Sequence, residues 1–292
     1  MLVGFPVHCQ MFLFLHAIGN ISHPNTFSYN LLTNIGHLAG TNPYIRVGGN
    51  TQDYALYNAS LKEAINGTYN LARSPDYPTT IFIGPSYFES YHTWPNTKYS
   101  HGFNMGLGGN NSAGWETLLE TVPLACKALG GGKLLWWEYG NEPDLYSTSS
   151  QGPVRPPTWN ESTYVEQWLN ATRAIKSQLA KACPDMLSNK TYGYMAPSFA
   201  GVSNHLKPTV AFADDLDADE DIRLISIHKY DLPLSYMNYT DRDQLYRRCN
   251  TAGCHSSRNA NEPYQYRALC QQSRNCSQQP SLPRNSIRSR RD

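Results

Sequence analysis

Apolar runs and stretches with helical periodicity alternate along the first 230 residues of the chain. The apolar runs are continuous rather than alternating with polar residues, as in strands of a parallel sheet that are buried on both faces. We therefore predict strands at Tyr44–Val47, Thr80–Gly84, Phe103–Leu107, Leu134–Glu138, Tyr192–Ala196 and Ile222–His228.

Helices are predicted between these runs, at Thr26–Leu38, Trp115–Leu129 and Thr158–Cys183. Gly40 can close the first of them. Thr158 with Glu161 has the capping-box pattern, which predicts the start of the third helix. Four residues recur on one face of this helix and are expected to lie in the core: Tyr164, Trp168, Ile175 and Leu179.

Repeated strand-then-helix units indicate an α/β protein with a parallel sheet, either doubly wound or closed into a (β/α)8 barrel. We expect residues 1–246 to form a partial (β/α)8 TIM barrel of about six to seven strands. Residues 247–292 are rich in Arg, Ser, Gln, Asn and Cys and show no strand or helix period. We expect this tail to be disordered or non-native.

Charge is distributed unevenly along the chain. The net charge is +1, but the tail carries nine Arg against Glu262 and Asp292, or 9 − 2 = +7, which leaves about −6 for the rest. The tail also holds Cys249, Cys254, Cys270 and Cys276. Their spacing is looser than in zinc knuckles, and no aromatic pattern accompanies the Arg residues. We therefore expect neither a metal site nor a nucleic-acid partner.

Asn-x-Ser/Thr sequons, the acceptors of N-glycosylation, are dense. Nine occur, which favours a secreted, extracellular glycoprotein; they begin at Asn20, Asn58, Asn66, Asn110, Asn160, Asn170, Asn189, Asn238 and Asn275. The apolar stretch Cys9–Ile18 makes a poor signal peptide because no Lys or Arg precedes it. No apolar run is long enough to span a bilayer, so no membrane partner is expected.

Two cysteines, Cys126 and Cys183, lie near the ends of predicted helices that would be neighbours in a barrel. A disulfide between them and a pair of buried free thiols are both consistent with this placement.

The segment most informative about chemistry is Leu134–Asp144, where the apolar strand runs directly into Gly-Asn-Glu-Pro. The carboxyl ends of barrel strands face the active site, which would place Asn141 and Glu142 at the mouth of a pocket. A partly desolvated carboxyl there can donate a proton to a glycosidic oxygen. The alternative is that Asn-Glu-Pro merely starts a helix, with Pro143 in its first turn.

Three motifs in the same order resemble the family 79 glycoside hydrolases, the group that contains β-glucuronidases and heparanases. They are Pro43–Asp53, Trp137–Asp144 and Ser226–Tyr230, and the resemblance covers roughly residues 20 to 245. It implies a retaining hydrolase that cleaves β-linked glucuronic acid from a glucuronide or polysaccharide, and such a mechanism needs no cofactor.

The resemblance also implies roles for individual residues. Glu142 would be the general acid and then the base, and Asn141 would bind the sugar 2-hydroxyl. His228 and Tyr230 would line the pocket. Arg46 would either orient carboxylates or form a structural ion pair beneath the site, and Asn50 and Asp53 are further substrate-binding candidates. Trp137 and Glu138 are expected to belong to the scaffold.

A second carboxylate, the nucleophile of a retaining mechanism, is not evident in the sequence. In the family it follows the seventh strand, and the chain departs from the family pattern just before that point. Glu262 lies in a second Asn-Glu-Pro, but no strand precedes it. We therefore expect the chain by itself to be inactive. A sugar-binding remnant without catalytic activity is the alternative function.

Overall fold

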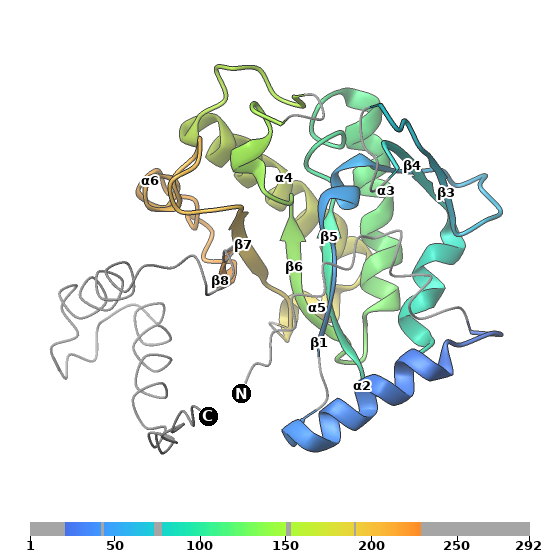
Figure 1. Cartoon of the computed structure of the whole chain (residues 1–292). Coiled ribbons are helices and arrows are strands. Elements are labelled where there is room, and N and C mark those ends of the chain that lie inside the picture. Colours follow the sequence, from blue (N-terminus) through green and yellow to red (C-terminus); the bar gives the residue numbers. More distant parts are fainter. Residues whose placement is uncertain (1–20, 42–43, 73–77, 150–152, 190, 229–292) are drawn as a thin grey trace, which may run out of the picture. The chain divides into compact units, whose positions relative to one another are not determined.

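The computed structural model describes residues 21–41, 44–72, 78–149, 153–189 and 191–228 (Figure 1). Tyr230, Glu262, the cysteines of the tail and the predicted boundary at residue 246 lie outside these ranges. The tail therefore remains a prediction.

A parallel five-stranded sheet forms the centre of the fold, with strand order β1-β5-β6-β7-β8. Its members are β1 (Tyr44–Val47), β5 (Lys98–Phe103), β6 (Leu134–Tyr139), β7 (Tyr194–Phe199) and β8 (Ile222–Ile227). The α/β class with a parallel sheet is confirmed. Five strands of this sheet lie within the described residues, fewer than the six or seven predicted.

A second, smaller sheet was not predicted. It consists of β2 (Ala55–Tyr57), β4 (Thr80–Ile83) and β3 (Ile65–Thr68), in the order β2-β4-β3. The predicted strand Thr80–Gly84 does form, but it pairs within this small sheet and not with the central one. Its apolar run could not show which strands it would pair with.

The prediction of a strand at Phe103–Leu107 was wrong, because Phe103 is the last residue of β5 and not the first. The strand could not be recognised from hydropathy because it contains polar residues that are buried, among them Ser100 and His101. After Phe103 the chain turns away, and the backbone N–H groups of Met105 and Gly106 donate to the Asp53 carboxylate.

The principal helices are α2 (Thr26–Ala39), α3 (Ser112–Ala128) and α4 (Glu161–Ala182), followed by the short α5 (Pro184–Ser188) and α6 (Pro208–Ala213). Gly40 ends α2 in the left-handed conformation, as predicted. The predicted capping box at Thr158 was wrong. Asn160 caps α4 instead, in a reciprocal pair with Thr163, because its amide oxygen reaches the N–H three residues on.

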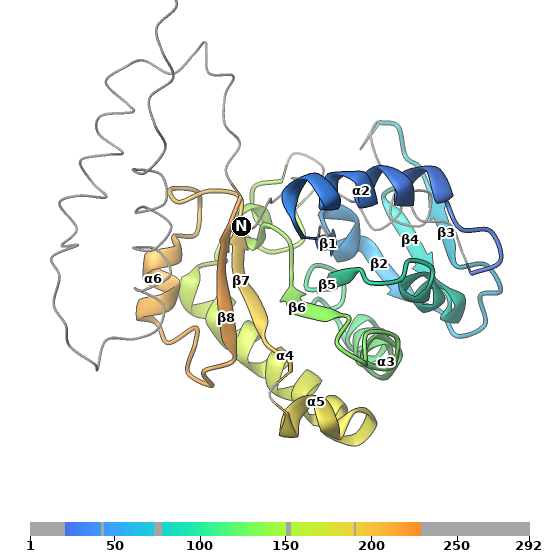
Figure 2. The ribbon, with the colours of Figure 1, turned by 90° about the horizontal axis from the view of Figure 1, so that it is seen from below.

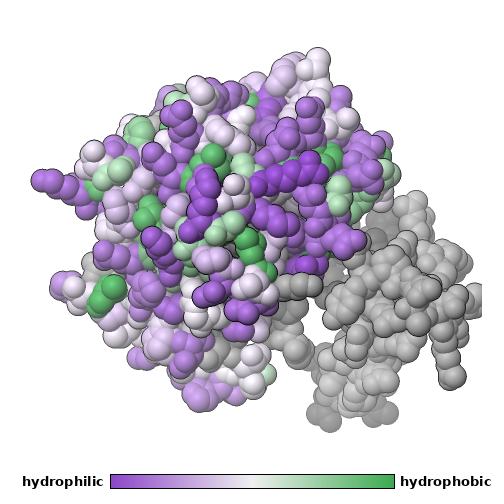
Figure 3. Space-filling view, turned by 180° about the vertical axis from the view of Figure 1, so that it is seen from behind, coloured by the Kyte–Doolittle hydropathy of each residue, from purple (hydrophilic) through white to green (hydrophobic). Residues whose placement is uncertain are grey.

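Helices α3 and α4 pack against each other on one side of the central sheet (Figure 2). The four predicted core residues of α4 are all buried, which confirms that prediction: Tyr164, Trp168, Ile175 and Leu179. The surface seen from behind is mostly hydrophilic, with apolar residues scattered in small groups (Figure 3). Within the described ranges, no helix is long and apolar enough to cross a membrane.

A disulfide joins Cys126, near the end of α3, to Cys183, directly after α4, across 57 residues of sequence. Closing a loop of this length restricts the unfolded chain, and removal of the bond should lower the free energy of unfolding by about 4 kcal/mol in the chain-entropy model. We expect Cys126→Ser/Cys183→Ser to show this loss in urea denaturation. An unchanged midpoint would contradict it.

Candidate active site

The turn that follows β6 presents the central residues of the site. Gly140 has φ of +84°, and a Cβ there would lie 2.8 Å from the Met105 sulfur, so both the backbone conformation and the space favour glycine. Glu142 is also left-handed, at φ +53°. This conformation is unfavourable for a residue with a side chain. It is held by a hydrogen bond from the Glu142 N–H to the Ser198 carbonyl of β7.

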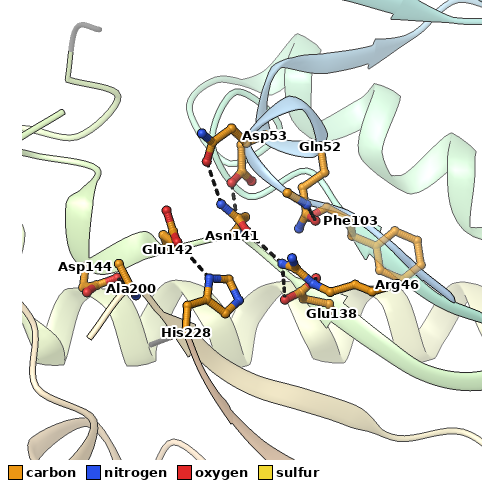
Figure 4. A network of polar contacts seen from close by, with 12 residues as sticks. Arg46, Gln52, Asp53, Phe103, Glu138, Asn141, Glu142, Asp144, Ala200 and His228 are labelled. Carbon is orange, nitrogen blue, oxygen red and sulfur yellow. Dashed lines mark hydrogen bonds and ion pairs between the residues drawn. The ribbon is translucent and has the colours of Figure 1, made fainter. Parts of the chain in front are cut away.

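The Asn141 side chain is fixed from two sides (Figure 4). Arg46 Nη2 donates to its Oδ1 at 2.7 Å, and its Nδ2 donates to Asn50 Oδ1 at 2.9 Å. Because a guanidinium only donates, the contact with Arg46 determines which atom of the amide is the oxygen. The amide is therefore held in one orientation before any ligand binds.

Arg46 forms a two-pronged ion pair with Glu138 of β6. Its Nε lies 2.9 Å from Glu138 Oε2, and its Nη2 lies 2.8 Å from Oε1. The Glu138 side chain is 1% exposed and that of Arg46 is 20% exposed. Such bidentate pairs are geometrically specific. The ion pair connects β1 to β6 directly beneath Asn141.

Glu142 is buried, and its Oε1 lies 2.8 Å from Nδ1 of His228. His228 follows β8, and its backbone N–H donates to the Phe199 carbonyl at 2.7 Å. The carboxyl and the imidazole thus approach each other from two strands separated by β7 in the sheet (Figure 4). A carboxyl group so placed can donate a proton to a bound ligand or accept one from it.

Asp53 lies beneath the turn, with both carboxylate oxygens engaged. Its Oδ1 accepts from the N–H groups of Met105 and Gly106, and its Oδ2 accepts from the N–H of Asn141. Burial raises the pKa of Asp53 to about 7, although these donors act in the opposite direction. Asp53 therefore ties together the loops that follow β1, β5 and β6.

Opposite pH dependences are expected from Asp53 and from His101, a core residue of β5. Burial lowers the pKa of His101 to about 3, against about 6.5 when unfolded. Between pH values of about 3 and 6.5, the His101 side chain is protonated in the unfolded chain but neutral in the folded protein. His101 therefore lowers the free energy of unfolding as the pH falls below 6.5. Folded Asp53 instead retains its proton between about 3.9 and 7, so it raises that free energy as the pH falls through this range.

We expect His101→Gln to remove the effect of His101 on the pH dependence of the free energy of unfolding, so that the effect of Asp53 is no longer opposed. Relative to the unsubstituted chain, its free energy of unfolding should rise by up to about 1.4 kcal/mol per unit of acidification below pH 6.5. Asp53→Asn should show the reverse trend. Urea denaturation at a series of pH values measures both slopes. Two variants with the same slope would be incompatible with these assignments.

Arg155, Tyr146 and Asp144 support the site without having been predicted. Arg155 donates to the carbonyls of Met105 and Gly106 and lies against the Tyr146 and Trp159 rings. Asp144 accepts from the Ala200 N–H and from Asn204. Asp144 lies inside the recognised motif, so its position could have suggested it. Nothing in the sequence around Arg155 or Tyr146 indicates such a role.

The hollow beside Asn50, Asn141 and Glu142 has a volume of only about 60 Å³. Ligand pockets usually measure about 300–1,000 Å³. The hollow that the described residues form here is therefore smaller than a typical ligand pocket. The described residues contain no group of three His, Cys, Asp or Glu side chains arranged to hold a metal ion.

Comparison with known proteins supports the motif resemblance. The chain matches no protein-family profile. It is 66% identical over 212 residues to a β-glucuronidase of Neurospora crassa and 56% identical over 212 residues to a β-glucuronidase of Aspergillus niger. The chain is a homologue of fungal β-glucuronidases. Each match spans 73% of this chain but only 38% of the relative.

A solved structure shares the fold of this β-glucuronidase homologue. It is a 4-O-α-L-rhamnosyl-β-D-glucuronidase from Fusarium oxysporum 12S in complex with Rha-GlcA, with a TM-score of 0.52 and 25% sequence identity. The match covers 72% of this chain and 42% of that chain. The relatives named here are glycoside hydrolases, and this chain corresponds to less than half of each.

Proposed function

We propose that the described residues form the acid/base half of the active site of a retaining β-glucuronidase of the family 79 type. The observation that carries this proposal is the buried Glu142, placed after β6 with His228 against its carboxyl and with Asn141 already oriented beside it. In this function the substrate is a β-linked glucuronide, and the mechanism uses no cofactor.

Glu142 acts first as an acid and then as a base. It protonates the glycosidic oxygen as the bond to the anomeric carbon breaks, and it later takes a proton from the water that hydrolyses the covalent intermediate. His228 holds the carboxyl in position. Asn141 donates or accepts a hydrogen bond at the sugar 2-hydroxyl, and Tyr230 lines the pocket.

The three candidates in and directly after β1 have different roles. Arg46 and Asn50 position the Asn141 amide, and Asp53 fixes the turn through its backbone bonds. Asn50 and Asp53 both line the hollow beside Glu142, so both remain candidates for contact with substrate. The carbohydrate then meets Asn141 and Glu142 directly, and Arg46 acts through Asn141.

The nucleophile comes from outside the described residues. The carboxyl groups of Asp53, Glu138 and Asp144 are each bound to donors that hold the scaffold together. A retaining mechanism requires a second carboxylate about 5–5.5 Å from the acid. We propose that it follows a further strand, added beyond β8, in a complete (β/α)8 barrel.

A hybrid enzyme tests this proposal. The 212-residue segment of the Neurospora crassa relative is replaced by the matching segment of this chain, and the release of p-nitrophenol from p-nitrophenyl β-D-glucuronide is measured. Turnover within about tenfold of the parent supports the proposal, since 10-fold corresponds to only about 1.4 kcal/mol of transition-state stabilisation. A folded hybrid that binds glucuronides without turnover would favour the sugar-binding remnant.

We also propose, separately from the activity, that the protein is secreted. The Cys126–Cys183 disulfide suits an oxidising compartment. The sequon asparagines within the described ranges are all exposed, as glycosylation requires: Asn58, Asn66, Asn110, Asn160, Asn170 and Asn189.

A further inference from the structure

A larger hollow, of about 450 Å³, lies where β6 begins, away from the turn that carries Glu142. The end of α3, the turn before β6 and the short helix α5 surround it. The residues that line it include Cys126, Leu129, Cys183, Met186, Asn189 and Thr191. The volume lies within the range that accommodates small ligands. We call this hollow the α5 groove.

The α5 groove has an apolar floor and a neutral rim. Leu129 is 0% and Met186 is 7% exposed, and Gly130–Gly132 line the groove without side chains. Lys127 and Asp185 line the groove with opposite charges. A neutral ligand with an apolar face and hydroxyl or amide edges matches this lining better than a phosphate or a cation does.

Both functional residues of one sequon, Asn189 and Thr191, line this same groove. Asn189 is exposed. Its position is fixed at the end of α5, where its N–H donates to the Asp185 carbonyl at 3.0 Å. A sugar attached to the Asn189 side chain would therefore begin in the wall of a hollow of suitable size and polarity.

We propose that Asn189 carries an N-linked glycan and that its first N-acetylglucosamine lies in the α5 groove, covering the Cys126–Cys183 disulfide. The donor is a lipid diphosphate-linked oligosaccharide of the secretory pathway. The Asn189 Nδ2–C1 bond forms as the bond from C1 to the diphosphate oxygen breaks; the lipid diphosphate leaves and takes up the proton that Nδ2 loses. This inference is independent of the hydrolase activity and requires only passage through the secretory pathway.

Occupancy is tested by glycopeptide mass spectrometry of the full chain made in yeast behind a leader peptide. Both the secreted and the cell-associated protein are analysed, so that a failure to leave the cell does not hide the result. We expect the Asn189 peptide to be mostly glycosylated. An unmodified Asn189 in both fractions would overturn the proposal.

Docking in the groove is tested with three substitutions around the sequon. Asn189→Gln and Thr191→Ala both abolish the sequon through different side chains, whereas Thr191→Ser preserves it. We expect the first two to speed reduction of the disulfide by dithiothreitol severalfold and to lower Tm by about 2–4 °C. Thr191→Ser should resemble the unsubstituted protein.

Asn66→Gln removes another exposed sequon, on strand β3, and serves as the control for loss of a glycan elsewhere. It should change neither the reduction rate nor the Tm. The docking claim fails if Asn66→Gln matches Asn189→Gln in both measurements, or if Thr191→Ser behaves like Thr191→Ala.

Discussion

Glu142→Gln in the hybrid enzyme should lower kcat/KM for an alkyl β-glucuronide by about 10²–10⁴-fold, the usual contribution of a positioned general acid. The amide keeps the size of the side chain but cannot donate the proton that a poor leaving group needs. For p-nitrophenyl glucuronide the first step should suffer much less, because that leaving group departs without protonation.

The dependence on the leaving group separates this role from a structural one. A substitution that merely distorted the site would lower kcat/KM for both substrates by the same factor. Glu166→Gln, the same change at an exposed position on α4, is the matched control and should leave both rates unchanged. Equal losses on the two substrates for Glu142→Gln would contradict the assignment of an acid.

Glu138→Gln should lower the free energy of unfolding by about 3 kcal/mol, at the lower end of the cost of breaking a buried ion pair. The substitution leaves the Arg46 guanidinium without its counter-charge, and the one-fifth of the Arg46 side chain that stays exposed limits the cost. Urea denaturation, followed by tryptophan fluorescence, measures the change.

The double variant Arg46→Met/Glu138→Leu should recover at least half of this loss, because two well-packed apolar residues often replace a buried pair without cost. Its activity in the hybrid should nonetheless stay low, since Asn141 loses the donor that orients its amide. If the double variant were less stable than Glu138→Gln alone, the ion pair would have to be stabilising in itself.

The strands that could be predicted from the sequence are those with continuous apolar runs. β6 (LLWWEY) is almost entirely apolar and four of the six residues of β8 (IRLISI) are apolar, whereas β5 contains Ser100, His101 and Gly102. His101 is accepted in the core because it is neutral there and its Nδ1 meets the Tyr91 hydroxyl. Local hydropathy does not show which side-chain contacts, such as that of His101 with Tyr91, form in the folded protein.

The residues of the site also divide into those with a local sequence signal and those without one. Asn141 and Glu142 were recognisable because a buried strand leads directly into them, and the structure places His228, Arg46 and Asn50 around these two residues. Arg155 and Tyr146 support the turn from positions with no such local signal. Their contacts depend on how the loops after β5 and β6 meet, and only the folded chain determines this.

Azide rescue tests the role of Glu142 most directly. In the hybrid carrying Glu142→Ala, an activated aryl β-glucuronide should form the covalent intermediate but hydrolyse it slowly, because no base activates water. Azide needs no base, so it should raise the steady-state rate and yield a glucuronyl azide of β configuration. An α-configured azide would identify Glu142 as the nucleophile, and the absence of any rescue would contradict its role as the acid/base.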